Sequence, residues 1–183
     1  MKFRYVLPAT LALCALATAG GGIVSGQYWL DLSTGWEFTA GQDANGSMEN
    51  PAEEKNLILN YDFENGGGSV FSSRDLGDIE AIESLLLIQL LVKGPGGNLA
   101  VAVEDAQNQL FIYRLGRLES DEQKMLEVQL ESPSEVAGKA GDKKIHYPVK
   151  SIRVMVEKDD LLLKGKITVE RFSFHSAQFQ KAN

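Results

Sequence analysis

The stretch that most constrains this chain runs from residue 85 to residue 115, where three apolar runs are separated by two breaks. The first run is apolar on both faces of an extended strand except at Gln89, and the second alternates leucine or valine with alanine. The breaks favour tight turns, because glycine adopts positive φ and proline fixes φ. These features predict a meander of three antiparallel strands in the middle of a β-sandwich. The runs are 85–92, 99–103 and 110–115, and the breaks are 93–97 and 105–109.

Alternation of apolar and polar residues predicts further strands on both sides of this stretch. Two long polar segments, 41–56 and 131–144, are predicted as loops because they lack an apolar period. With about eight or nine short strands and no convincing amphipathic helix, the chain is predicted to form an all-β antiparallel sandwich or barrel. The further predicted strands are 28–32 with its continuation at 36–38, 57–63, 69–76, 125–130, 148–157 and 167–174.

The first 19 residues have the pattern of a cleavable signal peptide. Lys2 and Arg4 precede an apolar segment, 5–16, and Ala-Thr-Ala at 17–19 fits the cleavage pattern. The apolar segment is shorter than the roughly 20 residues that span a bilayer. We therefore expect a periplasmic or secreted protein with no stable membrane insertion after signal removal. The expected regions are a signal peptide at 1–19, a flexible N-terminus at 20–27, a sandwich at 28–175 and a C-terminal tail at 176–183.

Charge and cysteine content exclude several classes of function. The net charge is −7 and no cluster of lysine and arginine is present, so nucleic acid is not an expected partner. The single cysteine, Cys14, lies in the predicted signal peptide; the mature chain is therefore expected to have neither a disulfide nor a thiolate metal site. The two histidines, His146 and His175, are far apart in sequence, which disfavours zinc. No catalytic motif is present, and we expect no enzymatic activity.

The order of the predicted strands and turns over roughly 28–175 resembles that of a known family. The segments that carry it are 84–97, 105–109, 110–115, 126–130, 141–142, 145–149, 151–154 and 164–167. This order resembles the galactose-binding-like jelly rolls, which occur as non-catalytic carbohydrate-binding modules beside glycoside hydrolases and as complex-I-intermediate-associated type domains. The resemblance implies a jelly-roll β-sandwich and an exported, non-catalytic binding module.

Such jelly rolls often hold a structural calcium ion between an acid on the first strand and an acid on the last. By position these would be Asp31 and Glu170. Carboxylates suit calcium, because this hard cation takes several oxygen ligands. The alternative is that both are ordinary solvated acids at strand edges.

Carbohydrate-binding modules use aromatic rings as platforms for sugars and polar side chains for the hydroxyls. The candidate platforms are Trp36, Tyr113 and Tyr147, and the candidate polar partners are Asp105, Gln109 and Arg114. The alternative is that the aromatic residues belong to the core, as most do in an all-β domain. Any site is expected at the edges of the central strands, at the 105–109 turn and in the long loops.

Two functions follow from these expectations. The first is a carbohydrate-binding module that takes a glycan on one face of the sandwich or at the loops. The alternative is a periplasmic accessory or assembly protein that uses the same sandwich to hold an envelope protein partner.

Overall fold

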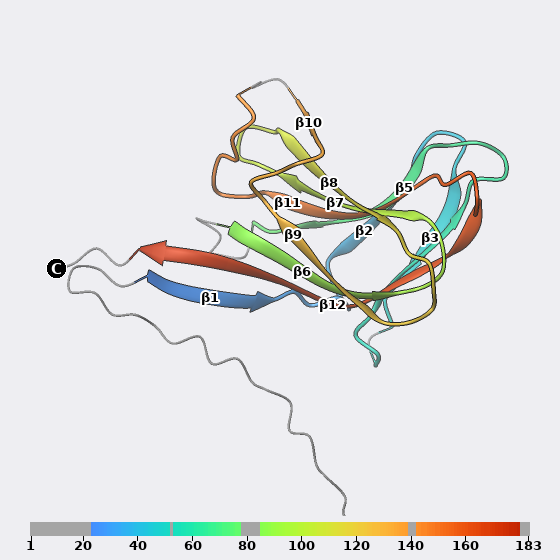
Figure 1. The fold of residues 1–183 in the computed structure, drawn as a ribbon, viewed down its shortest axis with the longest axis horizontal. Helices are drawn as coiled ribbons and strands as arrows, with labels where there is room; N and C mark the ends of the chain where they lie inside the picture. Colours follow the sequence, from blue (N-terminus) through green and yellow to red (C-terminus); the bar gives the residue numbers. More distant parts are fainter. Residues whose placement is uncertain (1–22, 52, 78–84, 139–141, 180–183) are drawn as a thin grey trace, which may run out of the picture.

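The computed structural model describes residues 23–51, 53–77, 85–138 and 142–179. These residues form twelve strands in two antiparallel six-stranded sheets, without a helix (Figure 1). The predicted all-β sandwich is thereby confirmed. The number of strands is higher than predicted, because short strands form at the margins of both sheets. In these segments no helix has the length and apolar character needed to cross a membrane.

The first sheet has a central strand that is paired along both edges. Its order is β3 (Asn45–Glu49), β4 (Leu57–Asp62), β12 (Lys164–Phe179), β6 (Leu85–Lys93) and β9 (Lys124–Gln129). β1 (Ile23–Trp29) pairs with the second half of β12. Figure 1 shows β1 and the end of β12 running side by side as a two-stranded extension.

The second sheet carries the site described below. Its order is β10 (Glu135–Ala137), β8 (Leu110–Arg117), β7 (Asn98–Glu104), β11 (Ser151–Glu157), β5 (Ser69–Asp75) and β2 (Trp36–Ala40). Alternate residues of β11 point into the core, where Ile152, Val154 and Val156 are fully buried. The residues between them therefore lie on the outer face of this sheet.

The predicted central meander is wrong in one respect. β6 pairs with β12 and β9, whereas β7 and β8 belong to the other sheet. The segment 94–97 therefore joins the two sheets and is not a hairpin turn. Gly94 has φ of 129°, and a Cβ at this position would collide with the backbone of Lys166. The glycine allows the chain to cross close to β12.

Several predicted boundaries are also corrected. β1 begins at Ile23, so the predicted flexible segment is a strand from there on, held by pairing with β12. β12 extends to Phe179, inside the predicted tail. β3 and β10 lie within the two predicted loops, because backbone pairing with β4 and β8 forms strands without an apolar period. The predicted signal peptide lies outside the described residues.

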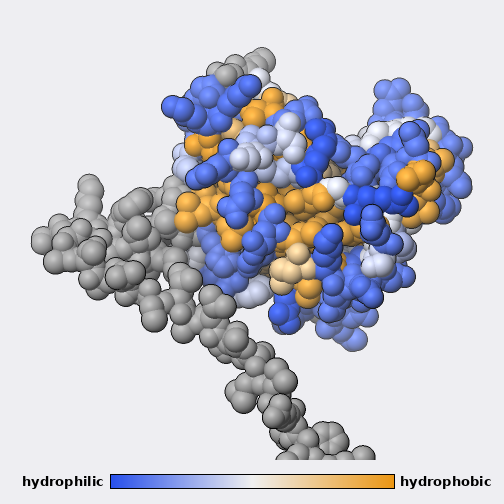
Figure 2. Space-filling view, in the orientation of Figure 1, coloured by the Kyte–Doolittle hydropathy of each residue, from blue (hydrophilic) through white to orange (hydrophobic). Residues whose placement is uncertain are grey.

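The surface combines hydrophilic margins with a smaller hydrophobic area near the middle of the face seen in Figure 2. The most exposed large hydrophobic side chains of the described residues are Trp29, Leu86, Met125, Tyr147 and Leu161. They come from different strands and loops. Single exposed hydrophobic residues are common on soluble proteins, and each therefore needs a reason of its own before it indicates a site.

Candidate functional site

The outer face of the second sheet contains a polar pocket of about 360 Å³. We call it the outer-face pocket. Antiparallel pairing places its side chains together, because Arg153 of β11 lies opposite Ser73 of β5, and Ser151 lies opposite Asp75. On the other side of β11, Ser151 is paired with Glu104 of β7. The lining residues are Gly35, Glu37, Ser73, Asp75, Glu104, Lys150, Ser151 and Arg153.

Arg153 is the central cation of the outer-face pocket. Its Nη2 donates to Glu104 Oε2 at 2.8 Å, and its guanidinium lies 5.2 Å from the centre of the Phe71 ring. Its Nε is buried and has no hydrogen-bond partner among the described residues. Native proteins pair the large majority of buried polar groups, so an unpaired N–H beside a pocket calls for an explanation. Protein atoms cover this N–H, so a ligand oxygen would reach it only after neighbouring side chains moved.

Beside the pocket, the outer face has a small apolar cluster. Ala100 and Ala102 of β7 are fully buried even though they point away from the sandwich core, and they pack with Ile112, Leu110 and Met155. This explains why β7 is buried on both of its faces. Because the alanine side chains are short, they project little from the middle of the sheet, whereas the longer charged side chains around them project further.

Arg114 closes the far side of this apolar cluster. Its Nε lies 2.8 Å from Glu157 Oε2, and its Nη2 donates to Glu157 Oε1 at 3.1 Å and to Glu135 Oε2 at 2.8 Å. The hydrogen bonds from Arg114 to both carboxylates raise the pKa of its guanidinium. The predicted polar residue Arg114 thus lies on the outer face, where its Nε and Nη2 are already engaged by Glu157 and Glu135.

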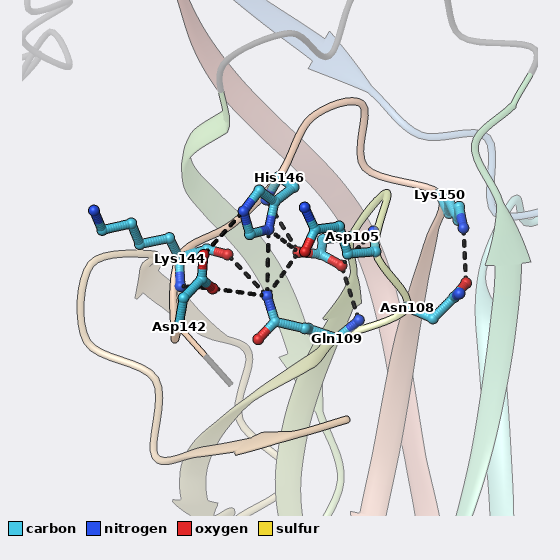
Figure 3. Close-up of polar contacts among 8 residues, drawn as sticks. Asp105, Asn108, Gln109, Asp142, Lys144, His146 and Lys150 are labelled. Carbon is cyan, nitrogen blue, oxygen red and sulfur yellow. Dashed lines mark hydrogen bonds and ion pairs between the residues drawn. The ribbon is translucent and has the colours of Figure 1, made fainter. Parts of the chain in front are cut away.

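The end of β7 is held by a polar cluster that extends from a buried carboxylate to the surface (Figure 3). We call it the Asp105 cluster; it consists of Asp105, Gln109, Asp142 and His146. Asp105 is fully buried. Its Oδ1 accepts from the backbone N–H of Gln109 at 2.8 Å and of Gln107 at 2.9 Å, and its Oδ2 accepts from the backbone N–H of His146 at 3.1 Å.

The imidazole of His146 lies between two carboxylates, as Figure 3 shows. Its Nδ1 is 3.0 Å from Asp105 Oδ2, and its Nε2 is 3.0 Å from Asp142 Oδ2. The Gln109 side chain adds donors to Asp142 Oδ1 at 3.1 Å and to the Lys144 carbonyl at 3.2 Å. Burial alone would raise the pKa of Asp105, but hydrogen bonds from the backbone of Gln109 and His146 hold it below the usual value.

The Asp105 cluster fixes one wall of the outer-face pocket. The Ala106 N–H donates to the His146 carbonyl at 2.9 Å, and the Lys150 N–H donates to the Glu104 carbonyl at 2.8 Å. Lys150 Nζ also donates to Asn108 Oδ1 at 2.7 Å. Lys150 belongs to the pocket lining. Asp105 and Gln109 are buried, so they position this wall and expose almost no surface of their own.

Two predicted aromatic platforms, Trp36 and Tyr113, lie in the core, so neither ring presents a face to a ligand. Trp36 is 6% exposed, packs against Phe172 and donates from Nε1 to the Asp31 carbonyl. Tyr113 is 3% exposed and donates from its hydroxyl to the Leu130 carbonyl. Each ring lies on the inward side of its strand, where large apolar surface is buried.

Tyr147 has a different role. Tyr147 is 37% exposed, but its hydroxyl accepts from the Leu85 N–H and donates to the Leu85 carbonyl, each at 3.0 Å. It lines a second pocket, at the end of the sandwich, together with Leu85 and Ile145. The structure therefore separates Tyr147 from the outer-face pocket.

The predicted calcium ligands Asp31 and Glu170 line a third pocket together. Glu170 Oε1 lies 2.8 Å from Lys93 Nζ, and Asp31 Oδ1 accepts from the Ser33 N–H at 2.9 Å and from its hydroxyl at 2.7 Å. These hydrogen bonds lower the pKa of Asp31. No group of three or more metal-binding side chains occurs in the part of the chain that the structure describes. This donor set does not fit calcium, which takes six to eight oxygens.

The residues that form the outer-face pocket were not predicted from the sequence. A usable signal was present, because alternation in β11 places Ser151 and Arg153 on the face opposite the apolar residues. The neighbours that turn these residues into a pocket, Glu104 and Asp75, come from strands whose pairing with β11 was unknown.

No protein-family profile matches the sequence, and no curated protein matches it. Solved structures with a similar fold are carbohydrate-binding modules. A family 11 carbohydrate-binding module of the cellulosomal cellulase Lic26A-Cel5E of Clostridium thermocellum is 17% identical with a TM-score of 0.62, over 81% of this chain and 94% of that chain.

Two further solved structures of carbohydrate-binding modules have a similar fold. A family 11 carbohydrate-binding module from Clostridium thermocellum, in complex with a β-1,3-1,4-mixed-linked tetrasaccharide, is 15% identical with a TM-score of 0.61, over 86% of this chain and 96% of that chain. The xylan-binding module CBM15 is 15% identical with a TM-score of 0.59, over 87% of this chain and all (100%) of that chain. The galactose-binding-like jelly-roll fold is thereby confirmed. At these identities the similarity concerns the fold.

Proposed function

We propose that this protein is an exported, non-catalytic carbohydrate-binding module whose outer-face pocket takes part of a neutral glycan. The single observation that carries this proposal is the pocket itself, which is lined by carboxylates, serine hydroxyls and Arg153, whose Nε has no hydrogen-bond partner among the described residues. Its volume of about 360 Å³ lies within the range of small-molecule sites.

The chemistry of the lining suits a sugar. Sugar hydroxyls donate and accept hydrogen bonds, so they need both kinds of partner. The carboxylates of Glu37 and Asp75 are exposed acceptors, Arg153 offers a donor, and Ser73 and Ser151 offer both. The apolar cluster next to the pocket presents Met155 and Leu110 to the less polar faces of a sugar chain.

The charge of the pocket favours a neutral glycan over an acidic one. Its carboxylates outnumber its cations, and both cations are engaged, Arg153 by Glu104 and Lys150 by Asn108. A sugar carboxylate placed here would meet uncompensated negative charge.

A titration of the full chain tests this proposal. The β-1,3-1,4-mixed-linked tetrasaccharide and a xylo-oligosaccharide are added in a calorimeter, and the sugar is afterwards analysed for cleavage. We expect binding with both sugars recovered intact. The variant Glu37→Ala removes an exposed acceptor, and we expect roughly tenfold weaker binding, since a hydrogen bond to a charged group contributes about 1.5–3 kcal/mol. Glu119→Ala, an exposed acid outside the pocket, is the matched control.

The outcomes separate the alternatives. Absence of binding across a panel of neutral and acidic glycans contradicts carbohydrate binding, and co-purification of one envelope protein would then favour the protein-partner alternative. Release of shorter sugars would show that the module is an enzyme. Equal affinities of Glu37→Ala and the unmodified protein would place the glycan elsewhere on the molecule.

A further inference from the structure

The first sheet contains a notch along one edge of β12. β6 pairs with β12 at residues 168–176, so β4 at 164–169 and β1 at 173–179 must both lie on the opposite edge. Between them, residues 170–172 of β12 have no strand partner on that edge, and a register shift falls between Val169 and Arg171. Such irregularities redirect side chains and are frequent next to binding sites.

A pocket of about 280 Å³ lies at this gap. We call it the β12 notch. Three segments that are distant in sequence form it: the end of β1 with the three residues that follow it, Lys55 ahead of β4, and the irregular part of β12. Its lining residues are Trp29, Leu30, Asp31, Leu32, Lys55, Glu170, Arg171 and Phe172.

An exposed indole forms one side of the β12 notch. Trp29 is the last residue of β1 and lies opposite Ser173. It is 60% exposed, in contrast to the buried Trp36. An aromatic side chain contributes most when its large apolar surface is covered. The Trp29 ring therefore offers a flat surface that a ligand in the notch would cover.

Charge distinguishes the β12 notch from the outer-face pocket. Lys55 and Arg171 are exposed, and neither side chain has an ion pair or hydrogen bond within the described segments. Glu170 is neutralised by Lys93. With Asp31 the only other acid in the lining, the notch presents two uncompensated cations against one carboxylate, on a chain whose net charge is −7.

We propose that the β12 notch binds an acidic sugar residue, a hexuronate within a glycan. The sugar ring covers the Trp29 indole, and its carboxylate is held by the Arg171 guanidinium and the Lys55 ammonium. Arginine suits this task because its planar fork matches a carboxylate. The same cations oppose a calcium ion between Asp31 and Glu170. This inference rests on the proposed function in that the ligand is a sugar, but it concerns a different face and a different class of sugar.

Tryptophan fluorescence tests the proposal, because Trp29 is the exposed one of the two tryptophans. The full chain is titrated with trigalacturonic acid in buffer that contains a chelator, and with neutral xylotriose for comparison. We expect trigalacturonic acid to change the emission and to bind at least tenfold more tightly than xylotriose at this site. Salt screens the attraction between the two cations and the acid. The affinity for trigalacturonic acid should therefore fall as salt is raised from 50 to 500 mM.

Variants assign the signal to the notch. Trp29→Phe should remove the emission change, and Arg171→Gln and Lys55→Gln should each weaken binding about tenfold. Lys158→Gln is the matched control, because Lys158 is outside the notch and faces the exposed Asp160. Glu37→Ala in the outer-face pocket should leave trigalacturonic acid binding unchanged.

Each contrary result has a distinct meaning. An Arg171→Gln variant that binds trigalacturonic acid as tightly as the unmodified protein overturns the proposal, as does binding that is seen only when the chelator is left out. Equal affinity for xylotriose overturns the preference for an acid. Loss of neutral glycan binding in Glu37→Ala with an intact notch signal supports both sites, whereas a notch signal without any neutral glycan binding contradicts the outer-face proposal alone.

Discussion

At the scale of single residues, Arg153 and Arg114 show how two similar side chains on one face differ in what they can still bind. Arg114 has its Nε and Nη2 donors on Glu157 and Glu135. Arg153 makes one ion pair, with Glu104, and keeps a buried Nε without a partner among the described residues. Of the two, only Arg153 has a buried donor that lacks a partner among the described residues.

Replacing Arg153 by lysine tests the ion pair with Glu104 and the unpaired Nε–H donor independently. Arg153→Lys keeps a positive charge for Glu104 but removes the Nε–H, and we expect roughly tenfold weaker binding of the neutral glycan with little change in melting temperature. Arg114→Lys should show the reverse, a lower melting temperature with unchanged binding. Calorimetric titration and thermal unfolding of both variants check this, and identical behaviour of the two variants would contradict it.

Asp105 carries a prediction about stability. It is fully buried and accepts three backbone N–H groups, so Asp105→Asn leaves some of these donors without a charged acceptor. We expect a loss of about 2–4 kcal/mol in the free energy of unfolding, measured with urea. A variant as stable as the unmodified protein would show that the Asp105 carboxylate does not stabilise the segments that it accepts hydrogen bonds from.

The lowered pKa of Asp105 gives this prediction a pH dependence. A carboxyl whose pKa is lower in the folded protein than in the unfolded chain stabilises the fold above its unfolded pKa, about 3.9. That contribution is lost as the pH falls through the lowered value. Urea unfolding between pH 7 and pH 2 should therefore show a smaller fall in stability for Asp105→Asn than for the unmodified protein; parallel curves would contradict the assignment.

At the scale of elements, strands were predictable where apolar and polar residues alternate, and their partners were not. The alternation in 57–63 and 148–157 predicted β4 and β11. β3 and β10 lack that pattern, because pairing with a neighbour's backbone forms them. The site was missed for the same reason: Arg153 was visible as an outward residue, but its neighbours depend on the sheet order.

The connection between β6 and β7 is expected to require a glycine at position 94. Gly94 has a positive φ, and a Cβ there would collide with the Lys166 carbonyl. We expect Gly94→Ala to destabilise the protein by at least about 1–3 kcal/mol, because strain and collision add. A Cβ added at Gly68 would have no other atom within 4 Å, so Gly68→Ala is the control and should leave the urea midpoint nearly unchanged. Equal midpoints for the two variants would contradict this account.

At the scale of the whole molecule, the fold could be recognised from the sequence, whereas the binding surface could not. The order of strands and turns indicated the jelly roll, which structures of 15–17% identity share. The aromatic residues chosen as platforms, Trp36 and Tyr113, are buried, whereas the exposed Trp29 was considered only as part of a strand. Aromatic residues in a strand look alike in sequence, and only burial tells a platform from a core residue.

Stability of the whole molecule also tests the calcium prediction. Because Lys93 already pairs with Glu170, we expect the melting temperature to be the same with and without a chelator. An ion bound only by the folded protein would raise that temperature, and more so the tighter it binds. A lower melting temperature after chelation would therefore show that the folded protein binds a metal ion, as the calcium prediction requires.

The extension formed by β1 and the end of β12 has a consequence for protein engineering. Ile23 and Phe179 are register partners, so the chain enters and leaves the described fold at one place (Figure 1). A short linker between these positions would close the backbone into a circle, and new ends could be opened in a surface loop. By the same geometry, the sandwich could be inserted into a loop of a host protein without separating the two ends of that loop.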